Sequence, residues 1–73
     1  MGTKVIEILS EMSNVPKERI TRSSRLAGDL GLSSLDMLTI LVRFEEELNI
    51  TIDDRQIPDI QTVGDILDML VTQ

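Results

Sequence analysis

The sequence predicts an all-α fold: a small four-helix bundle of three main helices and one short helix, with a long loop between the first two helices. Three observations predict it. Apolar residues recur at intervals of three and four in three segments. Two-residue alternation, the sign of strands, is nearly absent. The 73 residues leave room for one domain at most, so residues 1–73 are expected to form a single unit.

The first helix is expected over roughly residues 3–13. Four apolar residues fall on one side of it at helical spacing, namely Val5, Ile8, Leu9 and Met12. The helix should end near Asn14, because the residue before Pro16 is sterically driven out of the helical region.

A long connection follows, from residue 15 to residue 33. Loops of this length are uncommon in so small a domain unless something fixes them. Four apolar residues offer such anchors, namely Ile20, Leu26, Leu30 and Leu32. We therefore expect the loop to pack onto the helices, with part of it forming a short helical turn.

The remaining helices are predicted from residues that are typical of helix ends. The second is predicted from Ser34 to Leu48, with Asn49 as its stop. A short helical turn is expected near residues 54–57. The last helix should span about 63–71, because Thr62 and Asp65 have the spacing of a capping box. Its apolar face is expected to contain Val63, Ile66, Leu67 and Leu70.

The second helix has more apolar surface than one core needs. At about 100° per residue, a core stripe forms from Met37, Ile40, Leu41, Phe44 and Leu48. Glu45 interrupts the apolar arc beyond it, and an unpaired carboxylate is rarely buried. Leu35, Leu38 and Val42 should therefore face solvent, beside Glu45 and Glu46, as protein-docking surfaces do. The alternative is that these three residues cover the loop 15–33.

The composition excludes several classes of function. The chain has no cysteine and no histidine, which excludes disulfides, a Cys/His zinc site, a cysteine nucleophile and histidine acid–base catalysis. We expect no metal site and no catalytic residue, so the chain is not read as an enzyme. It shows no secretory signal peptide and no apolar run near 18 residues, and the expectation is a cytoplasmic protein.

The net charge of −6 constrains the partners. Nucleic acid is disfavoured, because phosphate backbones are bound by clustered Lys and Arg. No membrane contact is expected. An acidic domain suits partners with basic docking patches, although plain solubility is the alternative for any single acidic residue.

Two adjacent serines stand where the second helix begins. A serine there is most often a cap, whose hydroxyl accepts a hydrogen bond from a backbone N–H of the first turn, and Ser33 and Ser34 both fit that role. A serine nucleophile would lack its base, since the chain has no histidine.

The stretch "GDLGLSSLD" (residues 28–36) resembles the phosphopantetheine attachment motif of the acyl carrier protein family. Gly31, Ser34, Leu35 and Asp36 match the looser form of that motif. The resemblance continues through "FEEELNI" (44–50) and "TVGDILDML" (62–70), and so covers nearly the whole chain.

The resemblance implies that Ser34 carries a 4′-phosphopantetheine arm, delivered from coenzyme A by a phosphopantetheinyl transferase. Acyl intermediates would travel on the arm as thioesters to acyl-transferring and ketosynthase-type enzymes of fatty-acid or polyketide synthesis, which would dock through basic patches. The protein would act as a monomer. The expected docking residues are Leu35, Asp36, Leu38, Val42, Glu45 and Glu46.

Three positions depart from the family pattern. Ser33 stands where the family most often has Asp, a residue associated with recognition by the transferase. Thr39 replaces a common Glu, and Arg43 adds a positive charge to the helix.

Two other functions stay open at this point. One is an aminoacyl, peptidyl or D-alanyl carrier, and the other is a helical interaction module that is never modified.

Overall fold

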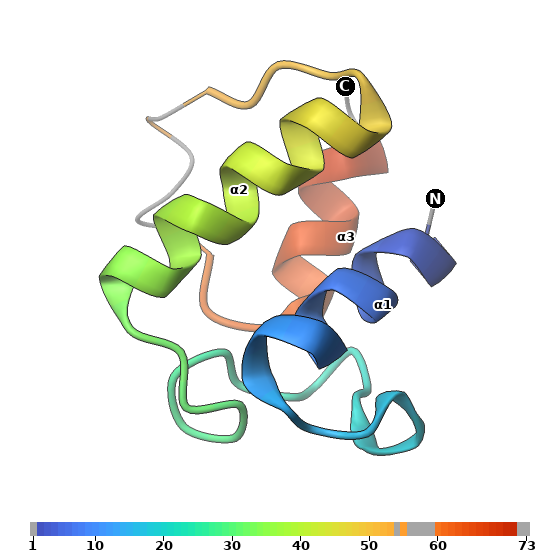
Figure 1. Cartoon of the computed structure of the whole chain (residues 1–73), viewed down its shortest axis with the longest axis vertical. Coiled ribbons are helices and arrows are strands. Elements are labelled where there is room, and N and C mark those ends of the chain that lie inside the picture. The colour runs from blue at the N-terminus through green and yellow to red at the C-terminus, as the bar shows by residue number, and fades with distance from the viewer. Residues whose placement is uncertain (1, 54, 56–59, 72–73) are drawn as a thin grey trace.

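The computed structural model (Figure 1) describes residues 2–53, 55 and 60–71. These ranges hold three α-helices, α1 (Gly2–Ser13), α2 (Ser34–Leu48) and α3 (Val63–Val71), and a 3-10 helix, η1 (Lys17–Arg19). They contain no strand, so the predicted all-helical bundle is confirmed. The short helical turn expected near residues 54–57 lies outside the described residues, except for Arg55.

Two asparagines end the first two helices. Asn14 and Asn49 adopt left-handed conformations, with φ of 62° and 56°. The N–H of Asn14 donates to the carbonyl of Ser10 at 2.9 Å, and that of Asn49 donates to the carbonyl of Glu45. Asparagine tolerates this conformation better than most residues, so both helices stop where the sequence predicted.

The core is aliphatic and surrounds a single aromatic ring. Phe44 is fully buried, together with apolar residues from all three helices, the first loop and the segment after α2: Val5, Ile8, Leu9, Ile20, Leu26, Leu30, Leu32, Ile40, Leu41, Ile52, Val63, Ile66, Met69 and Leu70. The predicted stripe of α2 is thus confirmed, with Met37 and Leu48 packed at its edge. The predicted face of α3 is incomplete, because Met69 is also buried while Leu67 is only half-buried.

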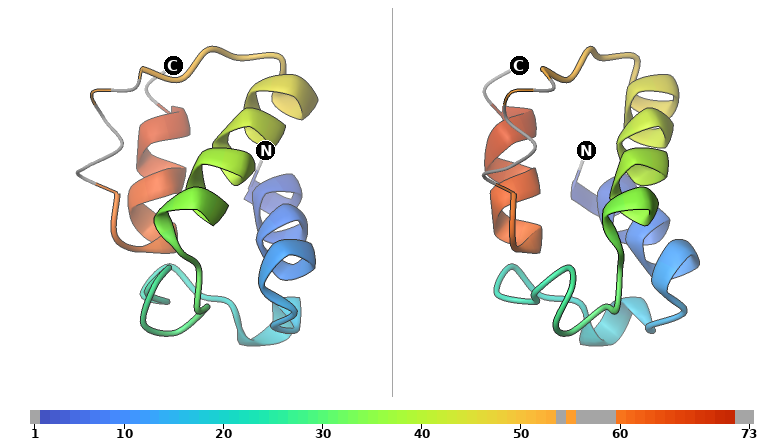
Figure 2. Two further views of the ribbon diagram at one scale, coloured as in Figure 1. Left: turned by 60° about the vertical axis from the view of Figure 1, so that its left-hand side comes forward. Right: turned by 90° about the vertical axis from the view of Figure 1, so that its left-hand side faces the viewer.

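The loop from residue 15 to residue 33 crosses one end of the bundle (Figures 1 and 2). All four of its predicted apolar anchors are buried. Its middle also pairs with the start of α3. The N–H of Leu26 donates to the carbonyl of Gln61 at 3.0 Å, and that of Val63 donates to the carbonyl of Ser24 at 3.0 Å.

The closest approach in this pairing occurs at Gly64. Its N–H donates to the carbonyl oxygen of Arg22 at 2.8 Å. A Cβ added at Gly64 would lie 3.0 Å from that same oxygen. The absence of a side chain therefore lets the loop lie against the first turn of α3.

Candidate phosphopantetheine attachment site

The start of α2 is closed by a reciprocal pair of hydrogen bonds. The hydroxyl oxygen of Ser33 accepts from the N–H of Asp36 at 3.1 Å, and the carboxylate of Asp36 accepts from the N–H of Ser33 at 2.9 Å. This is a capping box, with Ser33 as the N-cap residue. It satisfies two backbone donors that the helix itself leaves without partners.

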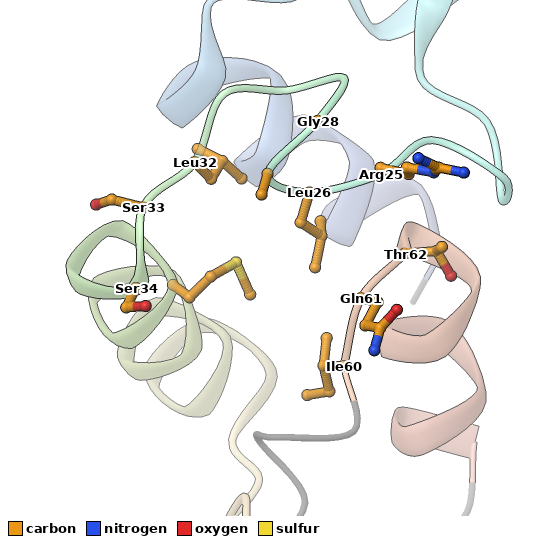
Figure 3. Close-up of a pocket in the computed structure, with 11 residues that line it drawn as sticks. Arg25, Leu26, Gly28, Leu32, Ser33, Ser34, Ile60, Gln61 and Thr62 are labelled. Atoms are coloured by element: carbon orange, nitrogen blue, oxygen red, sulfur yellow. The ribbon is translucent and has the colours of Figure 1, made fainter.

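Ser34, the first residue of α2, takes no part in this capping box. It is exposed, and its hydroxyl makes no hydrogen bond with any other residue that the structure describes. Figure 3 shows the Ser33 side chain pointing away from the neighbouring pocket, whereas the Ser34 hydroxyl lies on the pocket side. Of the two serines, only Ser34 presents an oxygen free of competing bonds.

The surroundings of Ser34 favour a bound phosphate. The first turn of a helix directs backbone N–H groups and the positive end of the helix dipole outward. A phosphodiester on the Ser34 oxygen would lie at this end of α2. The Asp36 carboxylate is occupied by the N–H of Ser33, and the N-cap position holds a neutral side chain.

A left-handed glycine leads the chain into this helix. Gly31 has a φ of 68°, which side chains with a Cβ rarely adopt. Its N–H donates to the carbonyl of Ala27 at 3.1 Å, and the N–H of Leu32 donates to the carbonyl of Leu26 at 2.9 Å. The turn therefore buries Leu32 and places both serines at the surface directly after it.

A pocket opens beside Ser34 and has a volume of about 580 Å³. It lies between the start of α2, the first loop and the segment that leads into α3 (Figure 3). Its apolar lining comes from Leu26, Leu32, Met37 and Ile60. No local sequence signal connects Ile60, Gln61 and Thr62 with the site, because their proximity to Ser34 is set by tertiary packing over more than 25 residues of chain.

The apolar residues expected on the outer face of α2 lie at the surface. Leu35 is 72% exposed, and Leu38 and Val42 are each 50% exposed. They do not cover the loop 15–33, so that alternative is wrong. Glu46 is also exposed, which leaves an apolar stripe with a carboxylate beside it.

Two of the expected docking carboxylates accept hydrogen bonds from backbone N–H groups. Asp36 caps α2, as described above. Glu45 is half-buried, and its carboxylate accepts a hydrogen bond from the N–H of Ile52 at 2.9 Å. That bond ties the end of α2 to the following segment, and it explains how a carboxylate is accommodated between two apolar arcs.

The positive charge of Arg43 does not face the apolar stripe. Its guanidinium lies 2.9 Å from carboxylate oxygens of both Glu11 and Glu47, and Lys4 lies 3.3 Å from Glu47. The hydrogen bonds that Arg43 donates to Glu11 and Glu47 raise the pKa of Arg43, and those donated to Glu47 lower the pKa of Glu47. The network joins α1 to α2, and only the folded structure brings Glu11 into it.

The described ranges hold no group of three or more Asp, Glu, His or Cys side chains that could bind a metal ion. None of the helices found there is long and apolar enough to span a bilayer.

Comparisons with known proteins agree with this geometry. The family model described as "Phosphopantetheine attachment site" matches residues 3–70. An acyl carrier protein of Porphyromonas gingivalis is 39% identical over 67 residues, which cover 92% of this chain and 86% of the relative. The acyl carrier protein of Thermotoga maritima is 38% identical over 65 residues, 89% of this chain and 80% of its own.

A solved structure shares the fold. It is described as a putative acyl carrier protein from Mycobacterium tuberculosis, and it superposes with a TM-score of 0.89 at 25% identity. The match covers 97% of this chain and 95% of the other.

The chain therefore belongs to the phosphopantetheine attachment site family. It is a carrier protein of the acyl carrier type, and its cofactor is a covalently bound 4′-phosphopantetheine. The arm supplies a thiol to a chain that has no cysteine.

Proposed function

We propose that Ser34 is the residue that carries the arm, and that the protein transports acyl intermediates as thioesters for fatty-acid or polyketide synthesis. The observation that carries the proposal is the contrast between the two serines: Ser33 caps α2, while Ser34 is exposed with a free hydroxyl. The acyl carrier proteins that resemble this chain support the acyl cargo.

Attachment requires the Ser34 hydroxyl to lose its proton and its oxygen to attack the phosphorus that bears the pantetheine in coenzyme A. The pyrophosphate bridge then breaks, and adenosine 3′,5′-bisphosphate leaves. The chain has no histidine, and the Asp36 carboxylate is held by the N–H of Ser33. The base must therefore come from the transferase. The protein supplies the nucleophile and a helix end that favours the resulting phosphodiester. We accordingly assign it no catalytic activity of its own.

Docking is assigned to the outer face of α2. The exposed stripe of Leu35, Leu38 and Val42 would supply apolar contact, and Glu46 would steer basic patches of the phosphopantetheinyl transferase, acyl-transferring enzymes and ketosynthase-type enzymes. Asp36 and Glu45 would contribute charge from this face while keeping their bonds to backbone N–H groups. A monomer leaves this face free for each enzyme in turn.

The pocket beside Ser34 is the proposed shelter for the cargo. Its apolar lining is adjacent to the point where the arm begins, so an acyl chain could fold back into it. The amide signals of Met37 and Ile60 should then shift when the thiol of the holo-protein is loaded with an octanoyl group. The arm thiol also needs a reducing compartment to stay free, which is why we place the protein in the cytoplasm.

Intact mass spectrometry tests the attachment residue. The wild-type chain, Ser34→Ala and Ser33→Ala are each incubated with coenzyme A and a broad-specificity phosphopantetheinyl transferase. The expected result is a gain of one arm on the wild type and on Ser33→Ala, and none on Ser34→Ala. A gain on Ser34→Ala would move the site to another residue. A wild-type chain that stays unmodified with several transferases would favour an unmodified interaction module instead.

A further inference from the structure

The positive charges of this acidic protein are concentrated in one loop. Residues 17–25 contain four of the seven basic residues, Lys17, Arg19, Arg22 and Arg25, and one acidic residue, Glu18. Their formal charge is 4 − 1 = +3, so the rest of the chain has −6 − 3 = −9. The molecule therefore has a basic segment on an otherwise strongly acidic surface.

Most of this charge is not neutralised inside the protein. Lys4, Arg22, Arg43 and Arg55 each lie within 3.3 Å of a carboxylate oxygen. The other three basic residues are Lys17, Arg19 and Arg25, and all three belong to residues 17–25. None of them forms an ion pair with an acidic residue that the structure describes.

An apolar groove adjoins this segment. It has a volume of about 460 Å³ and is lined mainly by apolar surface from the first turns of α1, from residues 17–22 and from α3. Ile6, Ile20 and Leu67 provide its aliphatic side chains. Its charged lining residues are Lys17, Glu18 and Arg22, and Arg22 also pairs with Asp68 at 2.6 Å. Apolar surface beside unpaired charge is the composition of a protein-docking site with a polar rim.

The groove is remote from the attachment site. In Figure 1 residues 17–22 lie at the lower right, whereas the first turn of α2 lies at the left. The groove and the pocket beside Ser34 share no lining residue. A partner bound in the groove would leave the Ser34 oxygen and the outer face of α2 accessible.

We propose that this groove, with Lys17 and Arg22 in its lining and Arg19 at the end of the adjoining η1, is a second docking surface that binds an acidic segment of a partner protein. An aliphatic side chain of the segment enters the groove between Ile6 and Leu67, and its carboxylates face Lys17 and Arg19. Charge complementarity selects the partner: the α2 face suits basic patches and this surface suits acidic ones.

A protein segment fits better than other anions. An extended polyanion, such as a nucleic acid or an anionic membrane, would meet the −9 of the remaining chain as well as the +3 of the loop. A short segment meets only the local charge, since charges more than about 8–10 Å apart are screened at physiological salt. Lys17 and Arg19, neither of which pairs with a described acidic residue, also exceed the single charge that one fatty-acid carboxylate would need.

NMR titration of the unmodified full chain tests the proposal without depending on the arm. The ¹⁵N-labelled protein is titrated with a blocked hexapeptide of two central leucines flanked by pairs of glutamates, and separately with its lysine counterpart. The acidic peptide should shift the amides of Ile6, Thr21 and Leu67 saturably. The lysine peptide should instead shift amides on the outer face of α2.

Two charge-reversal variants distinguish the effect of charge at the groove from the effect of the protein's net charge on peptide affinity. Lys17→Glu should weaken binding of the acidic peptide at least tenfold. Arg55→Glu changes the net charge equally but lies outside the groove, so it should alter the affinity less than twofold. Equal loss in both variants would show that only net charge matters and would overturn the proposal.

Three further results would also overturn it. One is the absence of saturable shifts with the acidic peptide, and another is shifts confined to α2. The third is binding of anionic phospholipid vesicles or dodecanoate at these same amides in preference to the peptide, because the occupant would then be a lipid.

Discussion

Ser33 and Asp36 hold each other in place: the Ser33 hydroxyl accepts from the Asp36 N–H at 3.1 Å, and the Asp36 carboxylate accepts from the Ser33 N–H at 2.9 Å. This pair makes two neighbouring serines chemically different. One belongs to the scaffold of the helix, and the other is left free at its surface.

The capping role of Ser33 predicts a loss of stability without a loss of modification. Ser33→Ala should lower the free energy of unfolding by about 1 kcal/mol, because the N–H of Asp36 loses its acceptor. Urea unfolding followed by circular dichroism measures this change. Ser33→Asp is the matched control, since an aspartate also caps helices and should retain most of the stability. An unchanged midpoint in Ser33→Ala would show that the cap contributes little.

The left-handed Gly31 predicts a purely conformational cost. Gly31→Ala should destabilise the protein by about 1 kcal/mol, because a residue with a Cβ is strained at a φ of 68°. Nothing lies within 4 Å of the added Cβ, so no clash contributes. Gly28→Ala is the control, because Gly28 lacks a positive φ and its added Cβ would make ordinary contacts at 3.5 Å. Thermal unfolding should show a lower midpoint for Gly31→Ala than for Gly28→Ala.

The bond between Glu45 and Ile52 predicts local loosening after α2. Removal of the carboxylate by Glu45→Ala leaves the half-buried N–H of Ile52 without its acceptor, at a cost of about 1 kcal/mol. Amide hydrogen exchange at Ile52 should accelerate about fivefold, which is that cost expressed as an equilibrium constant. Glu46→Ala removes an exposed carboxylate one residue later and should leave this rate unchanged. Equal exchange in all three proteins would contradict a structural role for Glu45.

The cap of α3 predicts part of the response to acid. The pKa of Asp65 is lowered by hydrogen bonds from the backbone N–H groups of Gln61 and Thr62, at 2.9 and 3.0 Å. The unfolded chain therefore takes up a proton at higher pH than the folded chain does. The resulting stabilisation is present above the unfolded value of about 3.9 and is lost as the pH falls through the lower folded value.

Asp65→Asn should make the decline in urea midpoint below about pH 4 shallower. Some decline should remain, because hydrogen bonds from Arg43 and Arg55 also lower the pKa values of Glu47 and Asp53. Urea titrations from pH 2 to pH 7 compare the two proteins. A slope as steep in Asp65→Asn as in the wild type would assign the acid response to other carboxylates.

Local signals predicted most of the helices. Asn49 ended α2 because its left-handed conformation is accessible to asparagine, and Thr62 with Asp65 capped α3 through contacts three residues apart. The buried stripe around Phe44 followed from helical periodicity alone. Each of these features depends on residues close together in the chain, so it is already present in the order of the amino acids.

Local sequence signals predicted only part of the candidate attachment site. The motif around Ser34 pointed to the attachment residue, but two serines with equal capping potential could not be separated by spacing. The folded chain distinguished them, because the Ser33 hydroxyl is the one that meets the N–H of Asp36. Likewise, the sequence placed Glu45 beside Leu38 and Val42, whereas its bond to Ile52 depends on how the chain turns after α2.

The sequence by itself determined the three helices, their ends, the core stripe of α2 and the resemblance that led to Ser34. These depend on short-range periodicity, caps and composition. Only the tertiary structure decided that Arg43 is neutralised by Glu11, that Ile60 borders the pocket of Ser34 and that Lys17 adjoins an apolar groove with Leu67. Such contacts join residues far apart in the chain, and packing of the whole bundle sets their distances.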